Sequence, residues 1–241
     1  MGRLVAEAIE AAEDLELAAL YDPAHAGQRV AGLEVEGQPD ALQEAQVVVE
    51  FTRPEVVMGN LRRWRGMGLN AVVGTSGFTE ARFQELRRSW GPGPPNCLVA
   101  PNFSIGAVLL MRLAELAAPF FSAAEVIELH HEAKADAPSG TALATARRLA
   151  DARRREPPAV QSEELVPGAR GAAVAGVPVH AVRLPGLVAH QEVILGAPGQ
   201  VLTLRHDTTD RRSFLPGVLL AVRRVGELTG VTVGLEALLE I

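Results

Sequence analysis

Short apolar runs alternate with stretches of helical spacing along the first half of the chain. The runs predict buried strands, and apolar residues that recur every three or four positions predict amphipathic helices. Strands are expected at residues 15–21, 47–51, 71–73 and 97–100. Helices are expected at 4–12, from Pro54 to Trp64, directly after Thr79, and at 105–118. This alternation is typical of a parallel sheet with helices on both faces.

The pattern changes in the second half of the chain. A strand is expected at 125–131 and a helix at 139–155, and a Pro- and Gly-rich surface loop should follow at 157–176. Three β-rich runs then come without an intervening helix, which suggests an antiparallel meander. These runs cover 177–184, 188–195 and 200–206. A final amphipathic helix is marked by Phe214, Val218, Val222 and Val225.

The chain is therefore expected to be an α/β protein with two domains of different architecture. Residues 1–104, completed by 213–241, should form a Rossmann-like doubly wound parallel sheet. Residues 105–212 should form an α+β domain with a mixed, largely antiparallel sheet. The length of 241 residues lets each domain bury a core of its own.

Composition and charge narrow the classes of function. The net charge of −6 leaves no basic surface for nucleic acid. The sequence has no uninterrupted apolar stretch of about 18 residues, so no membrane span is expected. The first residues lack the pattern of a secretion signal. The one cysteine, Cys97, lies in an apolar run and excludes an internal disulfide framework. A reducing, cytoplasmic location is therefore expected.

The densest polar cluster lies between residues 128 and 141, where a strand ends and a helix begins. Ser139 is expected to cap that helix. The N–H groups of Gly140 and Thr141 would then lie at the positive end of the helix dipole, which suits a carboxylate or a phosphate.

Three basic or titratable side chains precede this helix. His131 and Lys134 could bring positive charge to the anion, and His130 titrates near neutrality and can exchange a proton. The cluster thus suggests a small acidic substrate that gains or loses a proton. Other interpretations remain open, because His pairs on strands are commonly structural and Lys134 could form a solvated pair with Asp136. Zinc is disfavoured because no metal-ligand spacing is present, so no metal is expected.

A second set of residues follows the strands of the first domain. Ligands of doubly wound sheets bind at the carboxyl ends of the strands, where such loops gather. Asp22 closes a strand at the place where an acid would bond a cofactor ribose. Because no basic residue is adjacent to it, Asp22 slightly favours NADH. The loop residues concerned are Gly74, Thr75, Ser76, Ala100, Pro101, Asn102 and Phe103.

These motifs resemble the 4-hydroxy-tetrahydrodipicolinate reductase family, formerly called dihydrodipicolinate reductases. The most specific match is the run Glu128-Leu129-His130-His131 with Lys134 and Asp136-Ala137-Pro138-Ser139-Gly140-Thr141-Ala142. Supporting matches lie at 51–54, 73–78, 100–104 and 214–218, in the order of the family. The stretches 180–184 and 188–192 are similar to those of actinobacterial members.

The resemblance implies a role for each candidate residue. It implies that His130 is the general acid/base and that Lys134 is a proton donor or an electrostatic partner. It implies that residues 1–104 bind NADH or NADPH and that 105–212 bind a small cyclic dicarboxylate and form a homotetramer. The product would be tetrahydrodipicolinate, on the route to diaminopimelate and lysine. Substrate carboxylates would contact His131, Ser139, Gly140 and Thr141, and the cofactor would contact Asp22, 74–76 and 100–103.

The sequence departs from the family at its start. Members open with a strand and a Gly-rich turn that binds pyrophosphate, whereas Met1-Gly2-Arg3 resembles only the tail of that turn. Either the start codon is assigned too late, which is favoured here, or the chain is a fragment with impaired cofactor binding. Loss of the strand should uncover two strand edges and weaken NADH binding.

Two other functions remain possible from the sequence. One is a different Rossmann-type amino-acid or semialdehyde reductase. The other is a dicarboxylate-binding module that lacks a working cofactor site.

Overall fold

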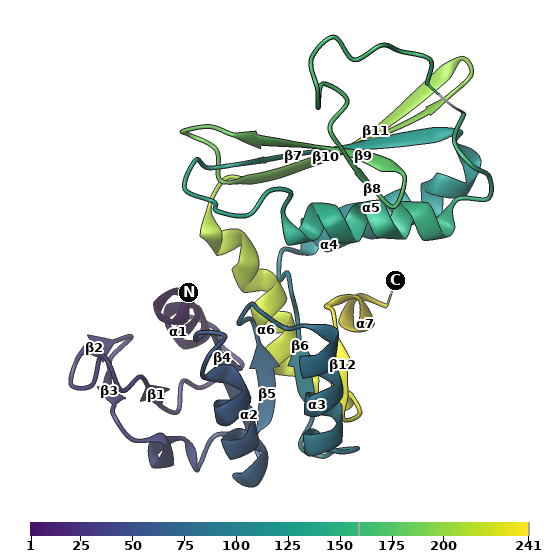
Figure 1. The fold of residues 1–241 in the computed structure, drawn as a ribbon. Coiled ribbons are helices and arrows are strands. Elements are labelled where there is room, and N and C mark those ends of the chain that lie inside the picture. Colours follow the sequence, from purple (N-terminus) through teal and green to yellow (C-terminus); the bar gives the residue numbers. More distant parts are fainter. Residues whose placement is uncertain (159, 241) are drawn as a thin grey trace. The chain divides into compact units, whose positions relative to one another are not determined.

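The structure, a computed structural model, describes residues 1–158 and 160–240. The chain divides into two units, which we call the first unit (Met1–Ile105 with Arg211–Ile241) and the second unit (Gly106–Asp210) (Figure 1). Two residues of the expected segments lie outside the described part: residue 159 of the loop 157–176 and residue 241 at the end of the chain.

The first unit contains the expected parallel sheet. Its strand order is β12-β6-β5-β4, and every neighbouring pair is parallel. The strands are β4 (Val47–Glu50), β5 (Asn70–Val73), β6 (Cys97–Val99) and β12 (Val231–Val233). The strand β12 was not expected from the sequence. Its three residues are too few for a periodic signal, and they become a strand by pairing with β6.

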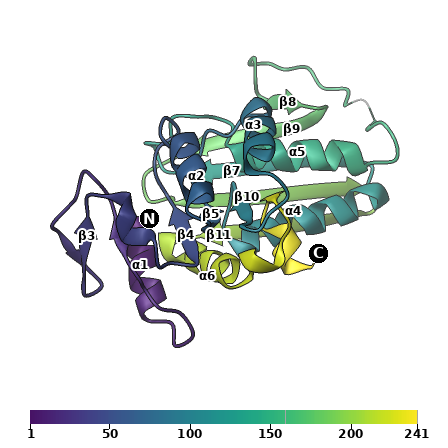
Figure 2. The ribbon, with the colours of Figure 1, turned by 90° about the horizontal axis from the view of Figure 1, so that it is seen from below.

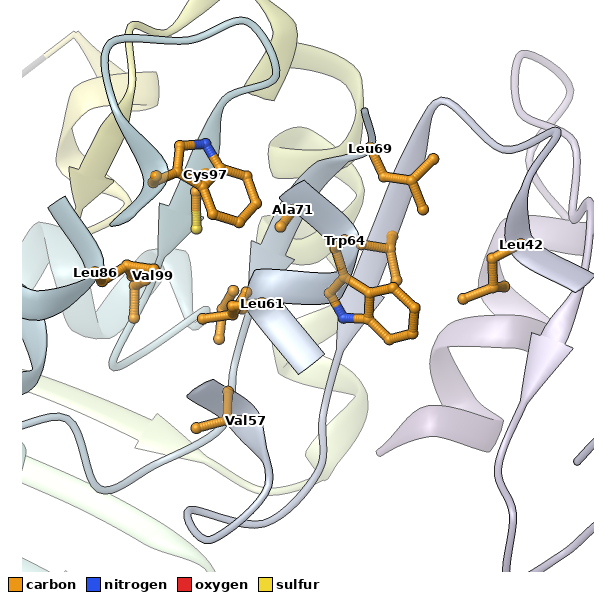
Figure 3. Packing of buried hydrophobic residues seen from close by; sticks show 12 residues of the cluster. Leu42, Val57, Leu61, Trp64, Leu69, Ala71, Leu86, Cys97 and Val99 are labelled. Carbon is orange, nitrogen blue, oxygen red and sulfur yellow. The ribbon is translucent and has the colours of Figure 1, made fainter. Parts of the chain in front are cut away.

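Helices cover both faces of this sheet. On one face, α2 (Val57–Gly66) and α3 (Glu80–Trp90) contribute Leu61, Trp64 and Leu86 to a core with Ala71 and Val99 (Figure 3). On the other face, α6 (Leu215–Arg224) contacts β5, and α1 (Gly2–Glu10) contacts α6. Thr79 caps α3 as expected, because its hydroxyl accepts the N–H of Arg82 at 3.3 Å. Pro54 lies in a turn before α2 rather than in its first turn.

A second, small sheet in the first unit corrects the expected strand at 15–21. Only β1 (Leu20–Tyr21) forms, because just these two residues pair with β3 (Leu33–Glu36). The hairpin partner of β3 is β2 (Arg29–Val30). Among the described residues, no strand pairs with the second edge of β1 or of β4. The first unit therefore has two sheets instead of one continuous sheet.

The second unit is built on a mixed sheet with the order β11-β10-β7-β9-β8. The strands are β7 (Ala123–His130), β8 (Ala172–Val174), β9 (Val177–Arg183), β10 (Ala189–Ala197) and β11 (Gln200–Thr208). The expected meander is wrong in one respect. β10 and β11 form a hairpin, but β7 lies between β9 and β10 and pairs with β9 in parallel.

The expected loop at 157–176 is too long by the three residues of β8. Ala175 and Gly176 both have positive φ, 50° and 74°. Two such residues between paired strands make a tight hairpin turn, so the chain folds back onto β9 at once.

Two helices cover one face of the mixed sheet. They are α4 (Ile105–Ala117) and α5 (Gly140–Ala152), and Figures 1 and 2 show them on the same side. Leu110 and Leu149 pack from these helices onto Val126, Val179 and Val193. No helix among the described residues contributes to a core on the opposite face. The remaining short elements are η1 (Pro39–Leu42), η2 (Ala118–Phe120), η3 (Arg211–Phe214), η4 (Val225–Glu227) and α7 (Glu236–Leu239), so α6 is not the last helix.

Two glycine-to-alanine changes should test the packing of the first unit with opposite results. A Cβ at Gly217 in α6 would lie 2.1 Å from the carbonyl oxygen of Phe103, whereas a Cβ at Gly59 in α2 would meet nothing within 4 Å. Gly217→Ala should lower the free energy of unfolding by about 2 kcal/mol. Gly59→Ala should raise it by up to about 1 kcal/mol. Urea unfolding followed by the fluorescence of Trp64 and Trp90, both in this unit, measures the effect. Equal effects of the two variants would contradict the packing described.

Candidate active site and cofactor pocket

Strand β7 brings two site residues to the side of the sheet that faces α5. Side chains alternate along a strand, so Glu128 and His130 point to the same face as the buried Val126. His130 is the last residue of β7, and the chain leaves the sheet there. Both side chains thus lie at the edge of the core that α5 covers.

Glu128 is the most buried charged group of the site. Its side chain is 0 % exposed, and its two carboxylate oxygens receive hydrogen bonds from several donors. Arg183 donates from Nη1 to Oε2 at 2.9 Å and from Nη2 to Oε1 at 2.8 Å. The N–H of Ser139 donates to Oε1 at 3.1 Å, and His130 Nδ1 contacts Oε2. A buried carboxylate needs such partners, since removal from water costs several kcal/mol.

These partners keep Glu128 ionised. Burial raises the pKa of Glu128, but the hydrogen bonds from His130 and Arg183 outweigh burial and bring the pKa to about 2. An ionised carboxylate only accepts hydrogen bonds, so Nδ1 of His130 must carry the proton between them. In the neutral ring, Nε2 is then the unprotonated nitrogen and can take a proton.

The start of α5 has the features of an anion site. Ser139 Oγ accepts the N–H of Ala142 at 3.2 Å, as expected for an N-cap. Gly140 is exposed, and the space where its Cβ would lie is open. The backbone of Gly140 and Thr141 therefore lies at the positive end of a 13-residue helix, within reach of a ligand.

Lys134 lies in the loop between β7 and α5. Its N–H donates to the carbonyl of His131 at 3.2 Å, and its ammonium group pairs with Asp136 at 2.7 Å. The Lys134 hydrogen bond holds the pKa of Asp136 below its usual value. Lys134 is also the only lysine among 23 lysines and arginines of the sequence. Every other residue of this set is an arginine. Position 134 therefore differs from them in carrying an ammonium group instead of a guanidinium.

The loops after β4, β5 and β6 meet in the first unit. The N–H of Gly74 donates to Glu50 O at 2.9 Å, and that of Ala100 donates to Val73 O at 3.0 Å. Thr75 Oγ1 accepts the N–H of Thr52 at 2.8 Å. The carboxyl ends of three neighbouring parallel strands are thereby tied together, which is where doubly wound sheets bind ligands.

Two phenylalanine rings lie over these loops. A Cβ at Gly74 would lie 2.1 Å from the Phe51 ring, so only glycine fits there. The rings of Phe51 and Phe103 are 5.7 Å apart. Phe103 is buried and Phe51 is half-buried, so the aromatic surface beside exposed Ser76 and Pro101 comes from Phe51. Such a surface suits a flat ligand with a polar tail.

A buried carboxylate supports this surface. Glu50, at the end of β4, accepts hydrogen bonds from Asn60 Nδ2 at 3.0 Å, from Trp64 Nε1 at 2.7 Å and from the Thr52 hydroxyl. These donors are neutral side chains, two from α2 and one from the loop at 51–54. Glu50 therefore fixes that loop, and with it Phe51, against the helix.

Asp22 lies apart from these loops in the small sheet, just after β1. Its carboxylate accepts the N–H of Ala24 at 2.9 Å and contacts His25 Nδ1 at 2.8 Å. Burial raises the pKa of Asp22, but the His25 and Ala24 hydrogen bonds outweigh it and leave the pKa lowered. Pro23 follows Asp22 in the sequence, and the structure adds a contact that the sequence analysis did not consider, because His25 folds back onto the carboxylate.

The structure brings some of the predicted residues of each unit together. In the second unit, Ser139 and His130 both contact Glu128, but Lys134 Nζ contacts Asp136 rather than His130. Sequence reasoning assigned no role to Glu128 or Arg183. A signal existed, since Glu128 interrupts an apolar strand on the same face as Val126 and therefore needs a buried partner. The position of that partner, 55 residues away, requires the strand pairing.

Two kinds of feature are absent from the part of the chain that the structure describes. Residues 1–158 and 160–240 contain no group of three or more His, Cys, Asp or Glu residues placed to hold a metal ion. In the same residues, no helix is long and apolar enough to cross a membrane.

Comparisons with known proteins match the chain to the same kind of reductase along its full length. Residues 1–103 match the family model "Dihydrodipicolinate reductase, N-terminus", and residues 106–239 match "Dihydrodipicolinate reductase, C-terminus". The 4-hydroxy-tetrahydrodipicolinate reductase of Mycobacterium marinum is 51% identical over 244 residues, and that of Nocardia farcinica is 52% identical over 252. Each match covers 100% of this chain and 95% of the relative. Both relatives come from actinobacteria, as the stretches 180–184 and 188–192 suggested.

A solved structure of a dihydrodipicolinate reductase has a similar fold. Dihydrodipicolinate reductase from Paenisporosarcina sp. TG-14, with dipicolinate bound, has a TM-score of 0.84 and 35% identity, covering 98% of this chain and 94% of that one. An amine dehydrogenase from Mycobacterium smegmatis, at 13% identity and a TM-score of 0.60, shares the fold alone, so it gives no support to a different Rossmann-type reductase. The chain belongs to the dihydrodipicolinate reductase family, whose members are oxidoreductases that use NADH or NADPH.

Proposed function

We propose that this chain reduces 4-hydroxy-tetrahydrodipicolinate to tetrahydrodipicolinate with NADH or NADPH, on the route to diaminopimelate and lysine. The observation that carries the proposal is the contact between His130 and the ionised Glu128 beside the start of α5. The family match, which extends over both units, supports the choice of substrate.

The second unit, corresponding to the 105–212 domain of the sequence analysis, would bind the substrate. A cyclic dicarboxylate carries two negative charges, and the start of α5 offers backbone donors and a positive dipole for one of them. Ser139, Gly140 and Thr141 would hold this carboxylate, and His131 would hold the other. The related reductase with bound dipicolinate, a planar ring with two carboxylates, supports this class of ligand.

The first unit, which corresponds to residues 1–104 with 213–241, would bind the cofactor. When bound, the cofactor supplies a hydride from its nicotinamide ring. The residues present fit such a group, because the half-buried Phe51 offers aromatic surface, the buried Phe103 ring lies 5.7 Å from it, and Gly74 adds no side chain beside it. The loops 74–76 and 100–103 would line the nicotinamide end. Asp22 would bond the adenosine ribose with its carboxylate.

His130 and Lys134 would supply the proton that the substrate ring gains. Loss of water from 4-hydroxy-tetrahydrodipicolinate gives a conjugated imine, and its reduction by hydride leaves a ring position that must gain a proton. His130 can deliver one from Nε2 after the ring is protonated, because its Nδ1 proton is held by Glu128. A lysine at 134, in a chain that uses arginine elsewhere, suits a group that must release a proton, since a guanidinium remains charged.

The second unit would also join copies of the chain into a homotetramer. The sheet face opposite α4 and α5 carries half-buried apolar side chains, and the described residues place no helix over it. An apolar sheet face of this kind is stabilised by a partner surface. The side chains concerned are Ile127, Leu129, Val182 and Ile194.

We place the reaction in the cytoplasm. Amino-acid biosynthesis and its reduced cofactors belong to that compartment, and the one cysteine, Cys97, is an unpaired buried thiol.

Substitution of the two proposed proton carriers should lower turnover without unfolding the chain. His130→Gln should reduce kcat about 100-fold, because a general acid contributes this much or more. Lys134→Arg should lose nearly as much activity as Lys134→Ala, because the guanidinium keeps the charge but not the transferable proton. The assay follows the loss of NADH absorbance with substrate made in situ by the aldolase that condenses pyruvate with aspartate semialdehyde. The control is Arg62→Ala, because the Arg62 side chain is exposed and pairs with Glu85. Wild-type rates in the variants of both His130 and Lys134 would contradict the roles.

Asp22→Asn should weaken NADH binding more than turnover. The amide loses the charge-assisted hydrogen bonds to the ribose, so KM for NADH should rise about tenfold while kcat changes little. His25→Ala removes the imidazole from Asp22 and should leave KM for NADH unchanged or lower. Initial rates at varied NADH measure both. An unchanged KM in Asp22→Asn would exclude the ribose contact.

Ile194→Arg should break the proposed assembly. A charge on the open sheet face opposes burial of that face against another copy. Light scattering after size exclusion should give a smaller mass than for the unaltered chain. Leu113→Arg, on the exposed side of α4, should leave the mass unchanged. A tetramer in Ile194→Arg would show that the interface lies elsewhere.

A further inference from the structure

The guanidinium of Arg183 joins three parts of the substrate-binding unit. Arg183 is the last residue of β9, and it reaches both carboxylate oxygens of Glu128 on β7 at 2.8 and 2.9 Å. The same guanidinium donates from Nη2 to the backbone carbonyl of Asp136 at 2.6 Å. It also donates from Nη1 to its own strand at Val182 O, at 2.7 Å. One side chain thus connects two strands and the loop that carries Lys134.

Arginine suits this position better than lysine would. The planar fork of a guanidinium matches the two oxygens of a carboxylate and keeps further N–H groups for a carbonyl. The contact with Glu128 raises the pKa of Arg183 further above its usual value, so the cation is permanent. An ammonium group has all its N–H donors on one nitrogen. It could not contact both oxygens of Glu128 and also the carbonyl oxygen of Asp136.

Glu128 is shared between two cations when His130 is protonated. Arg183 takes both of its oxygens, and His130 Nδ1 takes one of the same oxygens. The carboxylate of Glu128 would attract a positively charged His130 ring, and the guanidinium of Arg183 would repel it. Both charges therefore act on the same ring.

Other charges near His130 come from its neighbouring elements. Across the sheet, β10 presents the uncharged Ala189 in register with His130, and β9 presents Arg183. The start of α5 presents Ser139, which is neutral. The loop that follows β7 contributes the flanking groups His131, Glu132, Lys134 and Asp136. Lys134 and Asp136 pair with each other, so Glu128 and Arg183 are the charges that act on the ring most directly.

We infer that Arg183 and Glu128 form a positioning pair for the proton-transfer site. Glu128 fixes the Nδ1 proton of His130, so that Nε2 exchanges the proton with substrate. Arg183 balances the charge of Glu128 and anchors the Lys134 loop through Asp136 O. The inference rests on the proposed function for its kinetic part, whereas its effect on the titration of His130 does not require turnover.

The test measures the titration of His130 separately from activity. Diethyl pyrocarbonate reacts with an unprotonated imidazole nitrogen, and peptide mass spectrometry distinguishes His130 from His131. The rate of modification against pH, measured on the full chain, gives the midpoint of the ring's titration. Glu128→Gln should move the midpoint about one unit to lower pH, and Arg183→Gln about one unit to higher pH. Both should lower kcat in the NADH assay about tenfold or more.

A conservative variant separates the two roles of Arg183. Arg183→Lys keeps the positive charge beside Glu128, so the midpoint should stay within a few tenths of a unit of the wild type. Its kcat should still fall, because a lysine cannot hold Glu128 and Asp136 O together. Arg62→Gln, which removes an exposed arginine paired with Glu85, should change neither the midpoint nor kcat. If Arg183→Gln does not fold, Glu128→Gln and Arg183→Lys carry the test.

An unchanged midpoint in Glu128→Gln, or a wild-type kcat in Arg183→Lys, would overturn the inference. The proposed function can fail independently of the titration. If the wild type does not oxidise NADH with this substrate but the midpoints shift in the expected directions, the substrate assignment is wrong and the positioning of His130 by Glu128 stands.

Discussion

A fully buried carboxylate on a central strand is the constraint on which the substrate-binding unit depends. Glu128 cannot remain charged in the core without donors, and it obtains them from β9, from the start of α5 and from its own strand. Satisfying one charge therefore fixes the end of β7, the N-terminus of α5 and the Arg183 side chain relative to one another. The anion site and the proton carrier lie together because they share this partner.

The cofactor-binding unit uses a related device with neutral donors. Glu50 ends β4 in the core, and the indole N–H of Trp64, the amide of Asn60 and the hydroxyl of Thr52 surround it. This network ties the loop that carries Phe51 to α2, and Phe51 in turn leaves room only for glycine at position 74. In both units a buried acid at or near the end of a strand positions the loop beside it, although the ligands proposed for the two units differ.

Local signals predicted the parts of the molecule that depend on neighbours in the sequence. The caps at Thr79 and Ser139, the strands β4, β5 and β6 of the parallel sheet and the helices at 4–12 and 105–118 all follow from residues a few positions apart. Pairing across longer distances could not be read in the same way. The parallel alignment of β9 with β7, the addition of β12 to β6 and the two-residue pairing of β1 each depend on segments that the sequence does not show to be adjacent.

The same distinction between local and long-range contacts applies to the candidate site. His130, Ser139 and Gly140 belong to one continuous motif, so a single stretch of sequence predicted their proximity. The contact of Arg183 with Glu128 spans 55 residues, and it exists only because β9 lies beside β7. The contact between His25 and Asp22 was not predicted, for a different reason. This contact requires a turn that brings residue 25 back onto residue 22.

The most direct measurement of this account is an experimental structure of the chain with dipicolinate and NADH bound. The account predicts one carboxylate within hydrogen-bonding distance, about 2.7–3.2 Å, of the backbone N–H groups of Gly140 and Thr141. It also predicts that His130 keeps Nδ1 on Glu128 and turns Nε2 toward the ring of the ligand. A dicarboxylate bound away from the start of α5, or a His130 ring that turns Nε2 to Glu128, would contradict it.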